Sequence, residues 1–348
     1  MSHALPAPHD TRMFHEAHES VVAIARQLAG NESAITRLGA SLRAAPPRFV
    51  VTVARGSSDH AATYAKYLIE TQLGRMTASA SPSVSSVYSA EPNLEGALYI
   101  AISQSGKSPD LVRHAEGARR AGARVVALVN NVDSPLAAVA ETVIPLQAGP
   151  EKSVAATKSY LCSLSALLHL VARWRDDVGL LDALFDLPSS LSKAWNMDWS
   201  PLVDGLTDAR NLFVVGRGLG LGAVQEAALK LKETCGLHAE AFSAAEVKHG
   251  PMTLVERDFP VLFFAQPDDS WTGTIAVAEE FRRRGARVWL AAPNQPWPDA
   301  LPVASTLHPA CTPLATVLSF YRAANALSLA RGRNPDTPPH LNKVTETV

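Results

Sequence analysis

The pattern of apolar positions along the chain predicts strands that alternate with helices. Between residues 13 and 42, apolar and polar residues recur at helical spacing, which predicts helices ahead of the first strand. Short continuous runs rich in Val, Ile and Leu follow, and such runs are typical of buried strands. They occupy residues 48–54, 97–102, 124–129 and 141–146, with helical segments at 59–71 and 109–121. This alternation indicates a parallel, doubly wound α/β sheet.

The second half of the chain repeats this arrangement. The apolar run 212–215 leads into Gly216-Arg217-Gly218 and a long helical segment, as the first strand leads into Arg55-Gly56. An offset of about 162 residues sets Arg55 on Arg217 and Gln104 on Gln266, which indicates an internal duplication. A linker at about 194–201, rich in Trp and Asp, separates the halves. The predicted segments are an N-terminal helical segment 1–42, a first domain 43–185, a second domain 200–333 and a C-terminal tail 334–348.

Composition and charge narrow the class of protein. A chain of 348 residues with 47% apolar and 19% charged residues is long enough for two globular domains. The net charge of -1 provides no electrostatic surface for nucleic acid. The first twenty residues are polar, unlike a secretory signal, and no apolar segment is long enough to cross a membrane. Three widely spaced cysteines without CxxC spacing favour a reducing compartment, so we expect a cytoplasmic protein; they are Cys162, Cys235 and Cys311.

A serine-rich loop, SQSGKSP at residues 103–109, follows a predicted buried strand and opens a helix. Ser108 is expected as the N-cap and Pro109 as the first helical residue. Backbone N–H groups, the helix dipole, three hydroxyls and the Lys107 cation would converge there, which suits a phosphate group. A plain capping turn is the alternative, but ligands bind at the carboxyl ends of strands in open α/β sheets. The corresponding loop 265–269 reads AQPDD, which predicts that the second copy has lost its anion site.

Acids and bases gather between residues 225 and 251. Glu226, Lys230 and Glu233 have the i, i+4, i+7 spacing of one helix face. On spacing alone, a solvated face with weak ion pairs is the favoured alternative. A second cluster ends at His249, ahead of the turn Gly250-Pro251, as expected of an active-site loop. Glu246-x-x-His249 also resembles half of a carboxylate-bridged iron site, but the motif occurs once in this form, so we expect no metal.

A glycine-rich turn, GRGLGLGA at residues 216–223, satisfies the dinucleotide fingerprint GxGxxA when read from Gly218. The fingerprint also requires a second strand that ends in an acid about 20 residues later. That distance falls in HAEAFSAAE, which we interpret as helix and loop. We therefore expect the glycines to serve close packing and the protein to need no organic cofactor.

Taken together, these motifs resemble the sugar isomerase (SIS) domain family, and in particular the tandem-SIS isomerase half of glutamine–fructose-6-phosphate amidotransferase. SQSGKS is similar to the family's phosphate loop SQSGET. AGPEKSVAATKSY at 148–160 is similar to AGPEIGVASTKAF, and EAALKLKE with HAEAFSAAEVKHGP to EGALKLKE with HAEAYAAGELKHGP. The C-terminal DTPPHLNKVTETV is similar to DQPRNLAKSVTVE. The resemblance implies two α/β SIS domains with N-terminal helices and a catalytic tail.

The resemblance also implies a role for each matching residue. Glu233 becomes the base that moves a proton between C1 and C2, with Glu226 and Lys230 as its neighbours. His249 becomes the ring-opening acid/base, contributed by the other subunit of a homodimer, and Lys343 the Schiff-base lysine. Phosphate binding is assigned to Ser103, Gln104, Ser105 and Ser108, and sugar hydroxyl contacts to Ser58 and the Val154 backbone.

The chain departs from the family pattern at several of these motifs. Arg55 stands in place of Cys and Lys107 in place of Glu, and we assign both to substrate binding. We expect no glutaminase domain, and so no ammonia from glutamine. The resemblance then implies a glucosamine-6-phosphate deaminase that forms fructose-6-phosphate and ammonia. The alternatives are an isomerase or deglycase for another sugar 6-phosphate, or a non-catalytic sugar-phosphate-binding regulator.

Overall fold

The computed structural model describes residues 5–90, 92–294 and 296–343, which form two compact units. Of the described residues, the β1–β5 unit contains those within 22–151, 158–185 and 342–343, and the β6–β10 unit contains those within 5–21, 152–157 and 186–341. Both units are discontinuous in sequence, with boundaries inside the long helices α2 (Ser20–Ala44) and α8 (Val178–Trp195). The domain boundaries expected from the sequence stay a prediction. Residues 1–4 and 344–348 of the predicted terminal segments lie outside the described residues.

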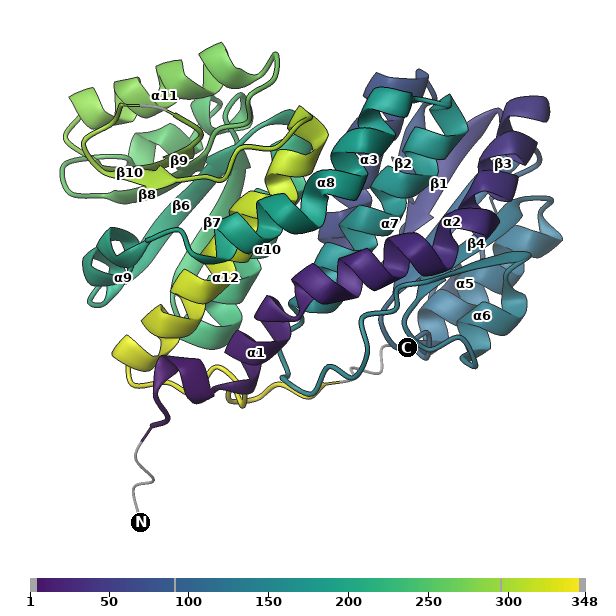
Figure 1. Ribbon diagram of the computed structural model, residues 1–348, viewed down its shortest axis with the longest axis horizontal. Helices are drawn as coiled ribbons and strands as arrows, with labels where there is room; N and C mark the ends of the chain where they lie inside the picture. The colour runs from purple at the N-terminus through teal and green to yellow at the C-terminus, as the bar shows by residue number, and fades with distance from the viewer. Residues whose placement is uncertain (1–4, 91, 295, 344–348) are drawn as a thin grey trace. The chain divides into compact units, whose positions relative to one another are not determined.

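The β1–β5 unit is built on a five-stranded parallel sheet with the order β2-β1-β3-β4-β5. Its strands are β1 (Phe49–Val53), β2 (Thr77–Ser79), β3 (Ala97–Ser103), β4 (Arg124–Val129) and β5 (Thr142–Pro145). Its helices are α3 (Ser57–Leu73), α4 (Ser83–Ser86), α5 (Pro109–Arg120), α6 (Pro135–Val139) and α7 (Lys158–Arg175), with α3 packed against α7 (Figure 1). Every residue of β3 is buried, as expected for a strand with helices on both faces.

The β6–β10 unit repeats this topology. Its sheet has the order β7-β6-β8-β9-β10, again all parallel, so each strand has a counterpart at the same place in the other sheet. The strands are β6 (Asn211–Gly216), β7 (His238–Ser243), β8 (Pro260–Phe264), β9 (Arg287–Ala292) and β10 (Ala300–Pro302). The shared strand order confirms the duplication that the sequence offset predicted.

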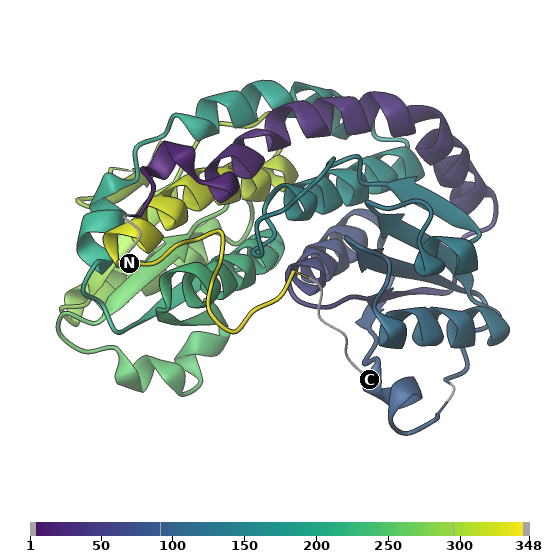
Figure 2. The same cartoon turned by 90° about the horizontal axis from the view of Figure 1, so that it is seen from below.

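Helices and 3-10 turns surround this second sheet. The α-helices are α1 (Arg12–His18), α9 (Ser200–Leu206), α10 (Leu221–Cys235), α11 (Trp271–Arg283) and α12 (Thr312–Ala330). The 3-10 turns are η1 (Pro8–Asp10), η2 (Gly218–Gly220), η3 (Glu246–Lys248), η4 (Pro251–Leu254) and η5 (Pro309–Cys311). Helix α10 packs along α12 (Figure 1), and residues 331–343, which follow α12, form a segment of turns and irregular structure, shown in yellow in Figure 2.

Most of the predicted elements are confirmed, with two corrections. The segment HAEAFSAAE is not helix and loop, because residues 238–243 form strand β7 beside β6. Its polar sequence reflects its place at the edge of the sheet, where much of the strand stays accessible to solvent. The predicted linker is also shorter than expected, because α8 continues to Trp195 and α9 begins at Ser200.

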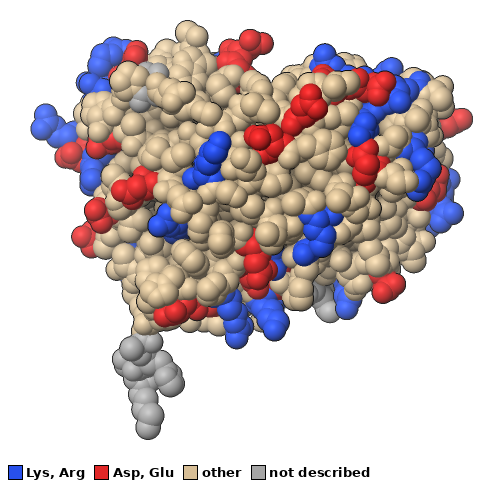
Figure 3. Space-filling view, viewed as in Figure 1, with Lys and Arg blue, Asp and Glu red and all other residues tan. Residues whose placement is uncertain are grey.

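The distribution of charged side chains on the surface agrees with the net charge of -1. On the face shown in Figure 3, basic and acidic side chains are interspersed. Within the described ranges, no helix is both long and apolar enough to span a membrane.

Candidate functional site

The serine-rich loop connects β3 to α5 and is held by hydrogen bonds between its own residues. The Ser103 hydroxyl accepts a hydrogen bond from Gly106 N at 3.1 Å, and the Ser105 hydroxyl accepts one from Lys107 N at 3.3 Å. Gly106 has a φ of 64°, and a Cβ there would lie 2.1 Å from the Ser134 hydroxyl, so only glycine fits. Ser108 occupies the N-cap position, but its hydroxyl makes no cap hydrogen bond. The loop therefore presents polar groups at the N-terminus of α5.

A second turn, between β1 and α3, lies beside this loop in the same unit. Strand β1 has β2 on one side and β3 on the other, so the chain leaves β1 and β3 at the switch point where α/β sheets bind ligands. The Arg55 guanidinium binds one carboxylate oxygen of Asp110, at 3.0 Å from Nε and 2.8 Å from Nη2. Asp110 is fully buried in the first turn of α5. Arg55 therefore joins the two turns, and Ser58 stands in the first turn of α3.

The acid–base residues of α10 form a buried ionic cluster in the β6–β10 unit. Lys230 Nζ lies 3.4 Å from Glu226 Oε1 and also contacts Glu233 Oε2. Tyr321, on α12, donates its hydroxyl hydrogen to Glu226 Oε1 at 2.8 Å. The side chains of Glu226 and Lys230 are 0% exposed, so the solvated-face alternative favoured by spacing alone is wrong. Tyr321 is a member of the cluster that the sequence did not reveal.

Burial and charge act in opposite directions on Lys230. Burial alone would lower the pKa of its ammonium group, but the Glu226 and Glu233 carboxylates together raise the pKa above its usual value. Glu233 is the one carboxylate of the three-residue cluster that reaches solvent, with 22% of its side chain exposed. Burying two carboxylates and an ammonium group costs desolvation energy, and such clusters often mark functional sites. Lys230 thus holds the Glu233 carboxylate in place from its buried position beside Glu226.

His249 lies between the turns η3 and η4 of the same unit and is exposed to solvent. Gly250 follows with a φ of 138°, a conformation that other residues rarely adopt. Glu246 begins η3, three residues earlier on the same exposed turn. Among the residues that the structure describes, no three His, Cys, Asp or Glu side chains are grouped as metal ligands would be.

Lys343 is held by an acid in the β1–β5 unit. Its Nζ lies 3.2 Å from Glu151 Oε2, with 26% of the lysine side chain exposed and the Glu151 side chain fully buried. Ser159 fixes the same carboxylate by donating from its backbone N at 3.1 Å and from its hydroxyl at 2.7 Å. Glu151 is the acidic residue of the motif AGPEKSVAATKSY, and no local signal in the sequence pointed to its contact with Lys343.

The loop that carries Val154 is anchored by two further acids, Glu16 and Asp336, which no sequence motif identified. Glu16, on α1, accepts hydrogen bonds from the backbone N–H groups of Lys152 and Ser153. The Asp336 carboxylate caps the N-terminus of α1, accepting from the N–H groups of residues 12 and 13 at 2.8 Å each. The Asp336 carbonyl also accepts from Val154 N at 3.4 Å. The backbone N–H of Val154 is therefore already engaged within the chain.

The glycine-rich turn after β6 serves close packing. A Cβ on Gly220 would lie 2.8 Å from Gln266 Cγ, and one on Gly216 would lie 2.6 Å from Val224 Cγ2. A parallel strand, β7, does follow α10, so the expectation of helix and loop at this distance was wrong. The side-chain contacts at these glycines support the packing interpretation.

The chain is similar to known proteins of one family, both in sequence and in fold. A family model described as "SIS domain" matches residues 45–173 and 205–292. The glutamine–fructose-6-phosphate aminotransferase (isomerizing) of Pyrobaculum aerophilum is 34% identical over 354 residues, covering 97% of this chain and 57% of that protein. The chain thus spans little more than half the length of this relative.

Two solved structures share the whole fold. A candidate phosphosugar isomerase from Silicibacter pomeroyi is 44% identical with a TM-score of 0.90, covering 94% of this chain and all of that one. Glucosamine-6-phosphate deaminase from Thermotoga maritima has a TM-score of 0.79 at 18% identity, covering 97% of this chain and 100% of that one. The second likeness concerns the fold alone.

Proposed function

Because the chain belongs to the SIS domain family, we propose that it is an enzyme acting on a sugar 6-phosphate, and that its reaction is the deamination of glucosamine-6-phosphate. The observation that carries the proposal is the buried cluster of Glu226, Lys230 and Glu233, with one carboxylate left at the surface. A protein that only binds a sugar phosphate needs the serine-rich loop and has no use for this costly arrangement. The cluster therefore favours an enzyme over a regulator.

The phosphate group has a suitable binding loop. We assign it to the polar side chains at the N-terminus of α5, with contributions from Ser103, Gln104, Ser105 and Ser108. The exposed Lys107 adds a positive charge beside the loop. Arg55 binds Asp110 in the first turn of α5. We therefore propose that it contributes to substrate binding by holding the loop in place, not by contacting the substrate. Ser58 and the Val154 carbonyl are assigned to sugar hydroxyls.

The proposed reaction then proceeds in three steps. His249 protonates the ring oxygen while the C1 hydroxyl loses its proton, which opens the ring to an aldehyde. Glu233 removes the proton from C2 and returns it to C1, while a proton passes from the amino nitrogen to the C1 oxygen, which gives the C2 imine of fructose-6-phosphate. Water adds to that imine carbon and ammonia leaves, which yields fructose-6-phosphate. Proton transfer by a placed carboxylate contributes about 10²–10⁴-fold to such rates.

Two further residues support the proton transfer. Lys230 holds the Glu233 carboxylate in place and stabilises its negative charge. Lys343 is proposed as a catalytic lysine because Glu151 fixes the position of its ammonium group. By resemblance to the family, the functional form is a homodimer to which His249 contributes from the partner copy.

An isomerase for another sugar 6-phosphate is the second candidate, because the 44% identical neighbour is described as a phosphosugar isomerase. A substrate panel separates the two functions. Glucosamine-6-phosphate, galactosamine-6-phosphate, glucose-6-phosphate and a fructosyl-amine 6-phosphate are each incubated with the enzyme. Ammonia and the sugar products are then measured.

Release of ammonia with fructose-6-phosphate from the first substrate supports the deaminase. If only another member of the panel is turned over, the glucosamine-6-phosphate deaminase is refuted and an enzyme acting on a different sugar 6-phosphate is supported. Binding of sugar phosphates without turnover of any panel member indicates a regulator.

A further inference from the structure

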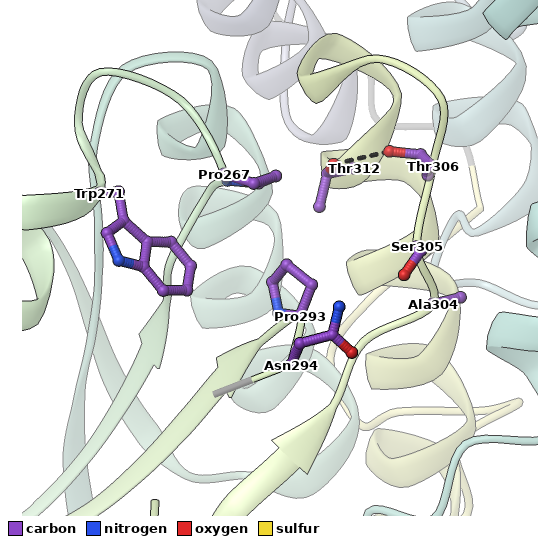
Figure 4. A pocket seen from close by; sticks show the side chains of 8 residues that line it. All are labelled: Pro267, Trp271, Pro293, Asn294, Ala304, Ser305, Thr306 and Thr312. Atoms are coloured by element: carbon purple, nitrogen blue, oxygen red, sulfur yellow. Dashed lines mark hydrogen bonds between the residues drawn. The ribbon is translucent and has the colours of Figure 1, made fainter. Parts of the chain in front are cut away.

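A cavity of about 320 Å³ lies at the carboxyl edge of the sheet in the β6–β10 unit. Its walls come from the segments that follow three neighbouring strands (Figure 4). Pro267 follows β8, Asn294 follows β9, and Ser305 follows β10. This edge is where parallel α/β sheets bind ligands, and the volume falls in the usual range of about 300–1,000 Å³ for small-molecule sites.

The cavity occupies the duplicated counterpart of the serine-rich loop. That loop follows β3, and the counterpart of β3 in the other sheet is β8, whose following loop carries Pro267. In place of Gly106 and Lys107, this second loop has Asp268 and Asp269. The two loops therefore lie at the same place in their sheets, but the second loop carries two acids where the first carries a glycine and a lysine.

Asp268 explains why this second site suits an uncharged ligand. One of its carboxylate oxygens accepts hydrogen bonds from Ser270 N at 2.8 Å and from the Ser270 hydroxyl at 2.6 Å, directly before α11. The chain's own carboxylate thus occupies the place beside a helix N-terminus where an anion would bind. The residues that line the cavity are all uncharged. A phosphate group would therefore meet no cation among the residues that line the cavity, and Asp268 beside the helix N-terminus would repel it.

The walls combine apolar rings with hydrogen-bonding groups. Figure 4 shows the Trp271 indole and the Pro293 ring extending into the cavity, with Thr306 and Thr312 across from them. Trp271 is half-buried against the core of the unit, so its ring is held in place. The two threonine hydroxyls are 2.8 Å apart, and Thr306 also donates to the His308 carbonyl. An aromatic face opposite hydroxyl groups suits a ring that is apolar on its faces and polar at its rim.

Two polar side chains in the wall stay available. Asn294 and Ser305 are exposed at the cavity, and no hydrogen bond to another described residue engages the Asn294 amide or the Ser305 hydroxyl. We propose that this cavity is a second binding site, which takes an uncharged pyranose sugar with one face on Trp271 and its hydroxyls on Asn294 and Ser305. The site is separate from the proposed catalytic residues and does not depend on the proposed reaction.

The test uses methyl α-D-glucopyranoside, which has no phosphate and cannot open its ring, so it cannot be a substrate of the proposed reaction. Binding is measured by saturation-transfer NMR and by titration of tryptophan fluorescence. We expect saturable binding in the millimolar range, lost on Trp271→Ala. The double variant Asn294→Gly/Ser305→Ala keeps the core intact, and glycine suits the φ of 53° at position 294. It should weaken binding by about tenfold, the effect of two lost hydrogen bonds.

Glu233→Gln is the matched control, because it alters the proposed catalytic base and should leave this binding unchanged. Absence of saturable binding to the wild-type protein would refute the proposal. Binding that the double variant retains in full would place the sugar elsewhere. Tighter binding of glucose-6-phosphate than of the glycoside, with the same sensitivity to the double variant, would refute the uncharged ligand class.

Discussion

Replacement of Lys230 by Met tests the buried ionic cluster most directly. Met is similar in length to Lys, so the change removes the charge and leaves little empty volume. The Glu226 carboxylate, with 0% of its side chain exposed, then loses the Lys230 cation and retains the Tyr321 hydroxyl as a hydrogen-bond donor. Removing one partner of a buried ion pair costs about 3–5 kcal/mol in the free energy of unfolding. We expect a loss of that size.

The matched control lies two residues further along the same helix. Lys232 is exposed, and Lys232→Met should change the free energy of unfolding by less than about 0.5 kcal/mol. Equilibrium unfolding in urea, followed by circular dichroism, measures both variants. A loss of about 3–5 kcal/mol lowers the urea midpoint by about 1 M or more.

The pH dependence distinguishes a lost ion pair from simple loss of packing. In the Lys230→Met variant, the buried Glu226 must take up a proton to fold without its cation. Acid makes this easier, so the difference in stability from the wild type should shrink as the pH falls from 8 to 5. A variant as stable as Lys232→Met, or a difference that does not change with pH, would refute the charged cluster.

Four further predictions concern the proposed sites. Glu233→Gln should lower kcat by about 10²–10⁴-fold and leave the affinity for sugar phosphate, measured by calorimetry, nearly unchanged; full turnover would exclude Glu233 as the base. Mixed, reassembled Glu233→Gln and His249→Asn subunits should regain up to roughly a quarter of wild-type activity if the site is shared between subunits; confirmed exchange without recovery would contradict this. Gly106→Ala should raise KM, because its Cβ would lie 2.1 Å from the Ser134 hydroxyl, whereas Gly117→Ala, where the nearest such contact is 3.7 Å, should leave KM unchanged. Burial raises the pKa of each thiol, to about 12 for Cys162, about 11 for Cys235 and about 12 for Cys311. The three thiols should therefore resist iodoacetamide at pH 8 until the protein unfolds, and rapid labelling of the folded protein would contradict their burial.

The sequence by itself determined the class of fold, because the signals for it are local. Short, β-branched runs such as 98–102 and 125–129 favour a buried strand over a helix because they are too short for a helix and helical segments flank them. The repeat offset predicted two copies, and the shared strand order confirms them. Strand β7 was missed because an edge strand is half exposed and need not be apolar.

The tertiary structure decided which charged residues are buried and what holds them. Spacing placed Glu226 and Lys230 on one helix face, but that face is buried because α12 covers it, and Tyr321 lies 95 residues away in sequence. Glu151 and Lys343 are separated by 192 residues, so their contact has no local signal. Sequence periodicity reports which face of an element is polar, whereas burial depends on the packing of distant segments. The sequence therefore identified the candidate chemical groups, and the fold determined their environment.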